Sequence, residues 1–197
     1  MRIYFSVVRR WWVAPGALAL TVLVCWTTGG TELPVPSFLG GSGGVQLRYF
    51  APLLVVMGVL YCLDRRLGEA EDTAVAPVIL RDHATVTGTV VLAHAVGPWA
   101  GMDVPRNVMV LLAVALAARR FMNTAAAGSV CMGALAVTVV MGRGTGASGQ
   151  VVFQEWALVI HPADSGAAWV AAVILFALAL AVSSGAGRFP PRGRAYG

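Results

Sequence analysis

Long runs of apolar residues, separated by short segments that carry arginine, constrain the fold of this chain more than any other feature. Six such runs can be recognised, at residues 11–28, 49–63, 83–99, 106–118, 124–141 and 166–184. A helix that crosses a bilayer needs about 20 apolar residues, with about 17 as a lower limit. The runs therefore predict an all-α fold, a polytopic transmembrane helical bundle of six spans that forms a single domain over residues 1–197.

The six runs differ in length. The first, fifth and sixth are long enough to cross a bilayer unaided, whereas the second and fourth are short and need flanking residues at 45–48 and 102–105. Local thinning of the bilayer and snorkelling side chains can accommodate a short span. Four full spans with two half-inserted segments are therefore an alternative to six.

The overall composition agrees with a membrane environment. Hydrophobic residues make up 58% of the chain and charged residues only 12%, whereas soluble domains carry about 25% charged residues. The net charge of +5 is spread between the apolar runs and is not gathered on one face. We therefore expect a lipid bilayer, and no nucleic acid, as the partner of this surface.

The arginines are divided unequally between the two sides that six spans would create. Eleven lie on the side of both termini and of the second and fourth loops, namely Arg2, Arg9, Arg10, Arg65, Arg66, Arg81, Arg119, Arg120, Arg188, Arg192 and Arg194. The other side holds Arg48, Arg106 and Arg143. Because short loops rich in arginine stay in the cytoplasm, this division predicts that both termini are cytoplasmic.

The basic residues also limit the chemistry of the chain. All fourteen are arginine, and the sequence has no lysine. A Walker A lysine and a Schiff-base lysine are therefore both excluded. Arginine in place of lysine, with abundant alanine, glycine and valine, indicates a GC-rich genome, and we expect a multi-pass protein of the bacterial cytoplasmic membrane.

Residues 1–28 can also be compared with a cleaved leader, because a basic start precedes an apolar run. No Ala-x-Ala site follows Trp26, and Val24 is too large for the position before a lipoprotein cysteine. We expect this segment to remain as the first span.

The three cysteines, Cys25, Cys62 and Cys131, lie in different runs and form no Cys-x-x-Cys pair. Neither a metal site nor a redox motif is indicated, and no cofactor is expected. We interpret the cysteines as small packing residues.

Small residues recur at four-residue spacing on three of the runs. The sets are Thr85, Thr89, Ala93 and Gly97; Ala125, Ser129 and Gly133; and Ala177, Ala181 and Gly185. Helices in lipid approach each other most closely at such stripes. We expect each stripe to be a contact between helices.

His94 is the one ionisable residue deep within a predicted span, on a face that also includes Thr87. Polar groups in lipid are costly and are often functional. His94, Thr87 and Ser129 are therefore candidates for polar residues of a pathway, with packing against a neighbouring span as the alternative. His83 lies about 16 Å away along a helix, too far to share a metal with His94.

Residues 144–149 match the dinucleotide fingerprint G-x-G-x-x-G, but that motif needs a preceding strand and a following helix in a soluble domain. Within it, residues 146–149 resemble the Gly-x-Ser-Gly motif of rhomboid intramembrane proteases, which also have six spans. The resemblance implies Ser148 as nucleophile with a histidine base on a later span. The only later histidine, His161, precedes the sixth run instead of lying within it.

Two connecting segments can carry function. The most polar is residues 64–82, which mixes both charge signs on the predicted cytoplasmic side. The other is the outer segment 142–165, in which residues 151–160 are apolar enough to lie at the membrane interface or to cap an outward opening.

The whole pattern resembles the membrane subunits of bacterial ABC exporters, the type-2 export permease class. The resemblance is one of topology: a basic, aromatic segment at residues 1–12, six spans, the charged loop at 64–82 and the semi-apolar outer loop at 151–160. It implies a permease that works with a separate ATPase subunit and a second permease subunit. It also implies that the charged loop docks on the ATPase, for which the candidates are Arg65, Arg66, Glu69, Glu71 and Asp72.

Two other functions remain open. One is a non-transporting membrane protein, such as an assembly factor, an immunity protein or a sensor subunit. The more remote one is an intramembrane serine protease that uses Ser148. Without an ATPase motif of its own, the chain is not expected to be an enzyme.

Overall fold

The computed structural model describes residues 10–28, 30–36, 42–64, 78–145 and 150–185. Within these residues the chain is mostly helical, as predicted. The α-helices are α1 (Val13–Thr28), α2 (Pro52–Asp64), α4 (Val78–Ala100), α5 (Asp103–Ala118), α6 (Thr124–Met141) and α7 (Gly166–Gly185), and a short 3-10 turn, η2 (Leu47–Tyr49), precedes α2.

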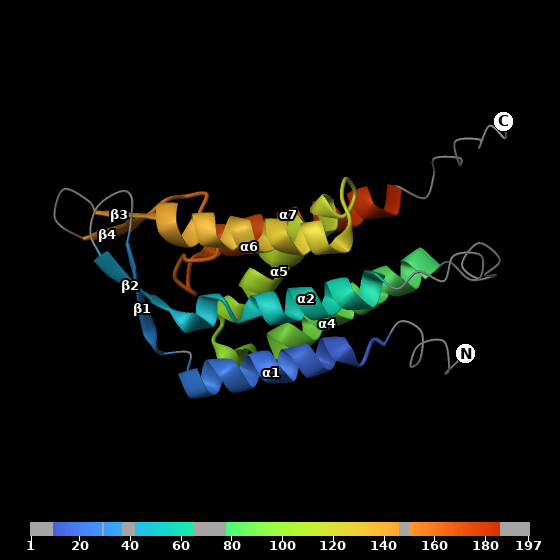
Figure 1. Cartoon of the computed structure of the whole chain (residues 1–197), viewed down its shortest axis with the longest axis horizontal. Coiled ribbons are helices and arrows are strands. Elements are labelled where there is room, and N and C mark those ends of the chain that lie inside the picture. The colour runs from blue at the N-terminus through green and yellow to red at the C-terminus, as the bar shows by residue number, and fades with distance from the viewer. Residues whose placement is uncertain (1–9, 29, 37–41, 65–77, 146–149, 186–197) are drawn as a thin grey trace.

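The helices lie roughly parallel to one axis, and successive helices run in opposite directions (Figure 1). The start of α1 and the end of α7 lie at one end of the bundle, and two β-hairpins lie at the other. Strand β1 (Glu32–Pro36) pairs with β2 (Ser42–Gln46), and β3 (Arg143–Thr145) pairs with β4 (Val151–Phe153), both antiparallel. The hairpins correct the all-α prediction, because they follow α1 and α6 in segments that were expected to be loops.

Helix α5 occupies the centre of the bundle. Fourteen of its 16 residues are buried, and it packs against α2, α4, α6 and α7. A helix that is covered on all sides by other helices has little contact with any solvent. This position explains how a short helix with charged residues in its first turn is accommodated.

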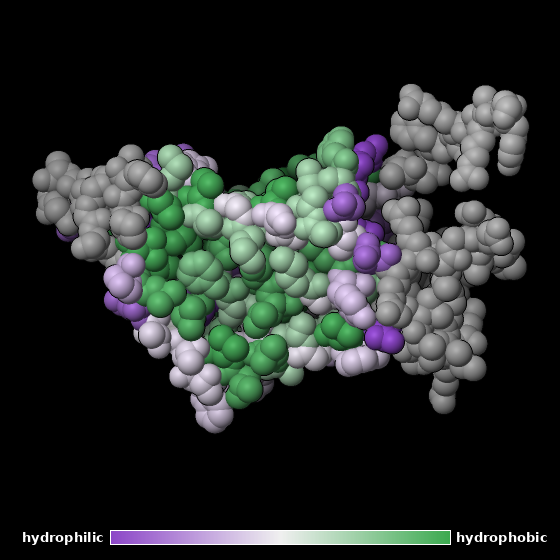
Figure 2. All heavy atoms as spheres, viewed as in Figure 1, coloured by the Kyte–Doolittle hydropathy of each residue, from purple (hydrophilic) through white to green (hydrophobic). Residues whose placement is uncertain are grey.

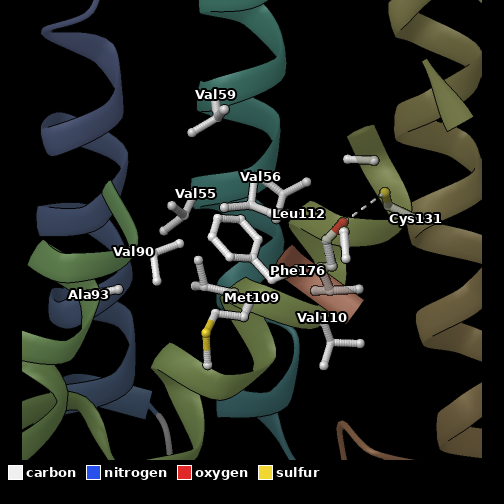
Figure 3. Close-up of a cluster of buried hydrophobic side chains, with 14 of the residues drawn as sticks. Val55, Val56, Val59, Val90, Ala93, Met109, Val110, Leu112, Cys131 and Phe176 are labelled. Atoms are coloured by element: carbon white, nitrogen blue, oxygen red, sulfur yellow. Dashed lines mark hydrogen bonds between the residues drawn. The ribbon is translucent and has the colours of Figure 1, made fainter. Parts of the chain in front are cut away.

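The core is made of aliphatic side chains contributed by the helices around α5. Val56 of α2, Val90 of α4, Leu112 of α5 and Phe176 of α7 lie in one cluster, as Figure 3 shows. Cys131 of α6 is fully buried beside them, and its thiol lies 3.6 Å from the carbonyl oxygen of Leu111. The cysteine is a packing residue here, in agreement with the sequence-based interpretation.

Three helical segments among the described residues are long and apolar enough to cross a membrane: Leu47–Asp64, Thr124–Met141 and Gly166–Ser184. The last two confirm the fifth and sixth predicted runs. The segment Leu47–Asp64 is long enough to cross a membrane only because η2 and the two residues after it extend α2. This agrees with the prediction that the run at 49–63 needs flanking residues. The run at 11–28 was expected to be long enough by itself, but α1 has only 16 residues. The runs at 83–99 and 106–118 are not among the three segments either, so length and composition support three of the six predicted spans within the described residues.

The small-residue stripe on α4 is a contact surface, since Thr89, Ala93 and Gly97 are buried. The predictions for α6 and α7 are wrong. Their stripes, Ala125, Ser129 and Gly133 on α6 and Ala177 and Ala181 on α7, are exposed. The packed faces instead contain larger residues such as Leu135 and Phe176. Spacing along a sequence identifies a helix face but does not say which way that face points.

Candidate functional site

A buried polar cluster lies at the first turn of α5, at the hairpin end of the bundle. Asp103 is 2% exposed, and Arg106 and Asn107 are fully buried. The preceding helix, α4, ends at Ala100, and the next residue, Gly101, has a φ of +109° that is accessible mainly to glycine. Because the chain reverses there, α5 begins inside the bundle and brings these three side chains with it.

Arg106 binds the segment that leads into α7. Its Nη1 donates to the carbonyl oxygen of Pro162 at 2.8 Å, and its Nη2 donates to the carbonyl oxygens of His161 at 2.7 Å and Val159 at 3.3 Å. Its Nε donates to Oδ1 of Asn107 at 3.3 Å. The planar guanidinium group suits this role, because it presents several N–H donors in a fixed geometry. The three hydrogen bonds to main-chain oxygens, which we call the Arg106 clamp, hold residues 159–162 on α5.

Asp103 forms an ion pair with Arg48, which lies on η2. Arg48 Nε is 3.3 Å from Asp103 Oδ2, and the Arg48 side chain is 34% exposed. Among the described residues, no hydrogen bond reaches the Asp103 carboxylate. The pair therefore neutralises a buried carboxylate with a cation that reaches solvent, and it ties η2 to α5.

Arg143 connects the two hairpins. Its Nη1 donates to the carbonyl oxygen of Gly44 at 2.9 Å, which joins β3 to β2. Arg48, Arg106 and Arg143 are the three arginines that the sequence placed on the outer side. Each of them binds protein atoms at the hairpin end.

At the opposite end, arginines bind the last turns of two helices. Arg119 Nη2 donates to the carbonyl oxygen of Leu63 at 3.0 Å, and Arg120 Nη1 donates to that of Val182 at 2.7 Å. Carbonyl groups in the last turn of a helix lack intrahelical donors and carry partial negative charge. The two arginines therefore join the short connection between α5 and α6 to the ends of α2 and α7.

His83 and two serines connect α4 with α7 at this same end. His83 Nε2 lies 2.7 Å from Ser183 Oγ, and Nδ1 lies 3.4 Å from Ser184 Oγ. Both serine hydroxyls also donate to the carbonyl oxygen of Leu180, at 2.8 Å each. Because those hydroxyl protons are directed to the helix backbone, the arrangement is a polar contact between two helices.

The structure does not bring the predicted polar pathway residues together. His94 Nδ1 bonds to the carbonyl oxygen of Val90 in its own helix at 2.8 Å, and its ring centroid is 5.5 Å from that of Trp169. Thr87 and Ser129 are exposed on the outer surfaces of α4 and α6. The contact with Trp169 of α7 agrees with the packing alternative for His94.

Other predicted residues lie outside the described part of the chain. These are the docking candidates Arg65, Arg66, Glu69, Glu71 and Asp72, and also Ser148. His161 Nε2 bonds to the carbonyl oxygen of Gln154 at 3.0 Å. In the glycine-rich stretch, β3 ends at Thr145 and the next described element is strand β4, so the helix that a dinucleotide fingerprint needs does not follow.

The apolar outer stretch at residues 151–160 combines exposed and buried positions. Val151, Val152 and Trp156 are exposed, whereas Ala157 and Ile160 are buried. Gly142 makes this packing possible, since a Cβ there would lie 2.5 Å from the Ala157 Cβ. The segment therefore lies over the ends of α5 and α6.

The Arg106 clamp was missed at the level of sequence, where Arg106 was assigned to the edge of a span. A signal was present nonetheless. Asp103, Arg106 and Asn107 occur at i, i+3 and i+4, which places all three near one face of a helix. The long sequence distance to residues 159–162 is what concealed their partners.

Comparison with known proteins identifies no relative: no family model, no curated protein and no solved structure matches this chain significantly.

Proposed function

We propose that the chain is a six-span protein of the bacterial cytoplasmic membrane, with both termini in the cytoplasm, and that it is the permease subunit of an ABC-type exporter. The observation that carries the proposal is the direction of the helices. With six antiparallel helices, α1 starts and α7 finishes at the same end of the bundle (Figure 1). Every helix then has the orientation that six spans require.

The surface of the bundle supports its placement in lipid. Large apolar side chains are exposed along the outer helices, among them Leu23 of α1, Val91 of α4, Met132 of α6 and Ile174 of α7, each 52% exposed or more. Hydrophobic residues cover the middle of the face seen in Figure 2, and hydrophilic residues gather toward its two ends. Exposed apolar belts of this kind are stable in hydrocarbon and costly in water.

The bonding of the arginines supports the proposed orientation. Arg48, Arg106 and Arg143 at the hairpin end bind a carboxylate or main-chain oxygens. The other eleven arginines lie, by sequence, on the side where α1 begins. The positive-inside rule assigns that side to the cytoplasm.

The packing of α5 supports a permease that works as a pair of subunits. Apolar side chains such as Val55, Val108 and Leu112 fill the space around α5. A polar substrate would find no favourable contacts there, because burying polar groups without partners costs free energy. A transport path is therefore better placed between two copies, or between this chain and a second permease.

The orientation can be tested with a matched pair of cysteine variants in intact cells. Glu155→Cys lies at the hairpin end and Phe121→Cys at the opposite end, and both side chains are exposed. A membrane-impermeant maleimide added outside should label the first and not the second. Equal labelling, or the reverse pattern, would contradict six spans with cytoplasmic ends.

The exporter function can be tested by purification of the protein with its partners. We expect an ATPase to copurify, and we expect the double change E69K/E71K to abolish its recovery by charge reversal of the proposed docking loop. Glu155→Lys makes the same kind of change at the hairpin end and should leave recovery unaffected. Unchanged recovery with E69K/E71K would remove the docking assignment.

The filled core also favours a second candidate, a non-transporting membrane protein that assembles with other subunits. Such a protein does not have to open a path for a substrate. The buried helix α5 and the Arg106 clamp on residues 159–162 can therefore stay as they are. Recovery of a stable complex that contains no ATPase would favour this candidate over the exporter.

A further inference from the structure

The short connection between α5 and α6 brings cationic and apolar side chains together at the end of the bundle where α7 finishes. Arg119 and Arg120 are followed by Phe121, which is 83% exposed, and by Met122, which is 40% exposed. Phe121 is the most exposed large apolar side chain among the described residues. We call residues 119–122 the basic–apolar corner. Cationic groups beside exposed apolar groups suit the membrane–water interface, where an aqueous and an apolar environment meet.

Main-chain hydrogen bonds hold the basic–apolar corner in one conformation. The N–H groups of residues 119–122 donate to carbonyl oxygens of Ala115, Ala117 and Ala118 at 2.9–3.2 Å. Asn123 then caps α6, because its side chain accepts from the N–H of Ala126 at 2.8 Å. A surface that is already ordered loses less conformational entropy when it binds a ligand. The corner is therefore a preformed surface.

Arg120 has unused donors that face away from its protein contact. Its side chain is exposed, and Nη1 donates to the carbonyl oxygen of Val182 at 2.7 Å. Within the part of the chain that the structure describes, Nε and Nη2 have no partner. Asp64, an exposed carboxylate at this end, accepts from Thr124 Oγ1 at 2.5 Å instead. Nε and Nη2 form one edge of the guanidinium, and that edge matches two oxygens of a phosphate group.

The net charge of this end favours an anionic ligand. By sequence, the side that holds both termini carries eleven arginines and five acidic residues, a net charge of +6. The hairpin side carries three arginines and four acidic residues, a net charge of −1, and together the two sides give the +5 of the whole chain. Basic segments next to a membrane are attracted to lipids that carry net negative charge. A zwitterionic lipid gains much less from this field, because its own cation offsets its phosphate.

We infer that the basic–apolar corner binds an anionic phospholipid, with the phosphate on Arg120 and the acyl chains against Phe121 and Met122. The inference rests on the proposed placement of this end at the cytoplasmic face of a membrane. A soluble phosphate would satisfy the guanidinium alone, and an uncharged lipid would satisfy the apolar side chains alone. An anionic phospholipid satisfies both, since its phosphate adjoins its acyl chains.

The test is thermal unfolding of the full chain in phosphatidylcholine vesicles with and without about 30% phosphatidylglycerol of the same acyl composition. We expect the anionic lipid to raise the unfolding midpoint by about 4 °C, because a ligand that binds the folded state stabilises it. Arg120→Gln should lose about half of this rise or more. Each variant is compared with itself in pure phosphatidylcholine, so the lost bond to Val182 does not enter. A full rise in R120Q would overturn the inference.

A second variant separates a site from a diffuse attraction of charge. Phe121→Ser leaves the net charge unchanged and should also reduce the rise, because it removes the contact with the acyl chains. Two controls lie at the hairpin end, where Gln150 and Trp156 are exposed. Gln150→Glu changes the net charge as much as R120Q does, and Trp156→Ser removes an exposed aromatic ring. Both should keep the full rise. A full rise in F121S, or a loss in Q150E equal to that in R120Q, would contradict a site at this corner.

Two further measurements identify the source of the phosphate and the status of the membrane placement. Inorganic phosphate added to the protein in detergent should not raise the midpoint as phosphatidylglycerol does, and an equal rise would reject a lipid ligand. Alkaline extraction of the vesicles separates this inference from the proposed function. Loss of the protein into the alkaline wash would remove both, whereas retention without any effect of phosphatidylglycerol would remove the lipid site alone.

Discussion

Arg106 Nη2 donates a hydrogen bond of 2.7 Å to the main-chain oxygen of His161, so the first turn of α5 holds the segment that leads into α7. The two residues are 55 positions apart in sequence. Arg106 is fully buried, and every described contact of its guanidinium is made to protein oxygen. The most deeply buried charge in the described chain is therefore a structural link between helices.

Replacing Arg106 with alanine should destabilise the fold by about 3 kcal/mol, because the carbonyl oxygens of Val159, His161 and Pro162 would lose their donor in a buried or partly buried setting. Arg106→Lys keeps the charge but cannot reach all of these oxygens, so we expect about half that loss. Thermal unfolding in detergent measures both effects.

Arg120→Ala is the matched control for the clamp. Arg120 also donates to a main-chain oxygen, that of Val182, but in an exposed setting. Its removal should cost less than about 1 kcal/mol. A loss at Arg120 as large as that at Arg106 would show that burial does not set the strength of these bonds.

The pair formed by Arg48 and Asp103 should show a measurable but modest coupling. We expect Asp103→Leu to cost about 1–2 kcal/mol and Arg48→Met about 1 kcal/mol, since Arg48 is one-third exposed and partly screened. The double variant should lose less than the sum, by about 1 kcal/mol. Strict additivity, measured by a double-mutant cycle on the unfolding free energy, would mean that the two charges do not interact.

Hydrophobic run length predicted the helices of this chain well. Residues 124–141 coincide with α6, and 166–184 coincide with α7 to within one residue. Both helices lie on the outside of the bundle and expose large apolar side chains such as Met132 and Ile174. Run length is a local property, so the sequence displays it directly.

Features that depend on long-range packing were not predictable in the same way. The two hairpins contain few of the β-branched alternations that mark strands, and β1 includes Pro34. Arg106 looked like a residue at the edge of a short span because its partners at 159–162 lie far along the chain. The stripe through Ser129 had the spacing of a contact face, yet Leu135 and its neighbours make the contact instead.

Gly101 should resist substitution for a reason of backbone conformation. Its φ of +109° is strained for any residue with a side chain, and an added Cβ would lie 2.7 Å from Asp103 Oδ1. Gly101→Ala should therefore cost about 1–3 kcal/mol in unfolding free energy. Gly16→Ala serves as the control, because Gly16 lies in helix α1 and an added Cβ there would meet no neighbouring group within 4 Å, so alanine should be neutral or slightly stabilising.

The close approach of α1 and α2 depends on Gly58. An added Cβ at this position would lie 2.9 Å from the Cβ of Ala17 and 3.6 Å from the carbonyl oxygen of Val13. Neither neighbour is the flexible end of a long side chain, so Gly58→Ala must push the two helices apart, at about 1–3 kcal/mol. Gly133→Ala is the same chemical change on α6, where an added Cβ would meet no neighbouring group within 4 Å. Unfolding in mixed micelles should therefore show a clear loss for G58A and none for G133A. Equal effects of the two changes would indicate that α1 and α2 do not pack closely at Gly58 and Ala17.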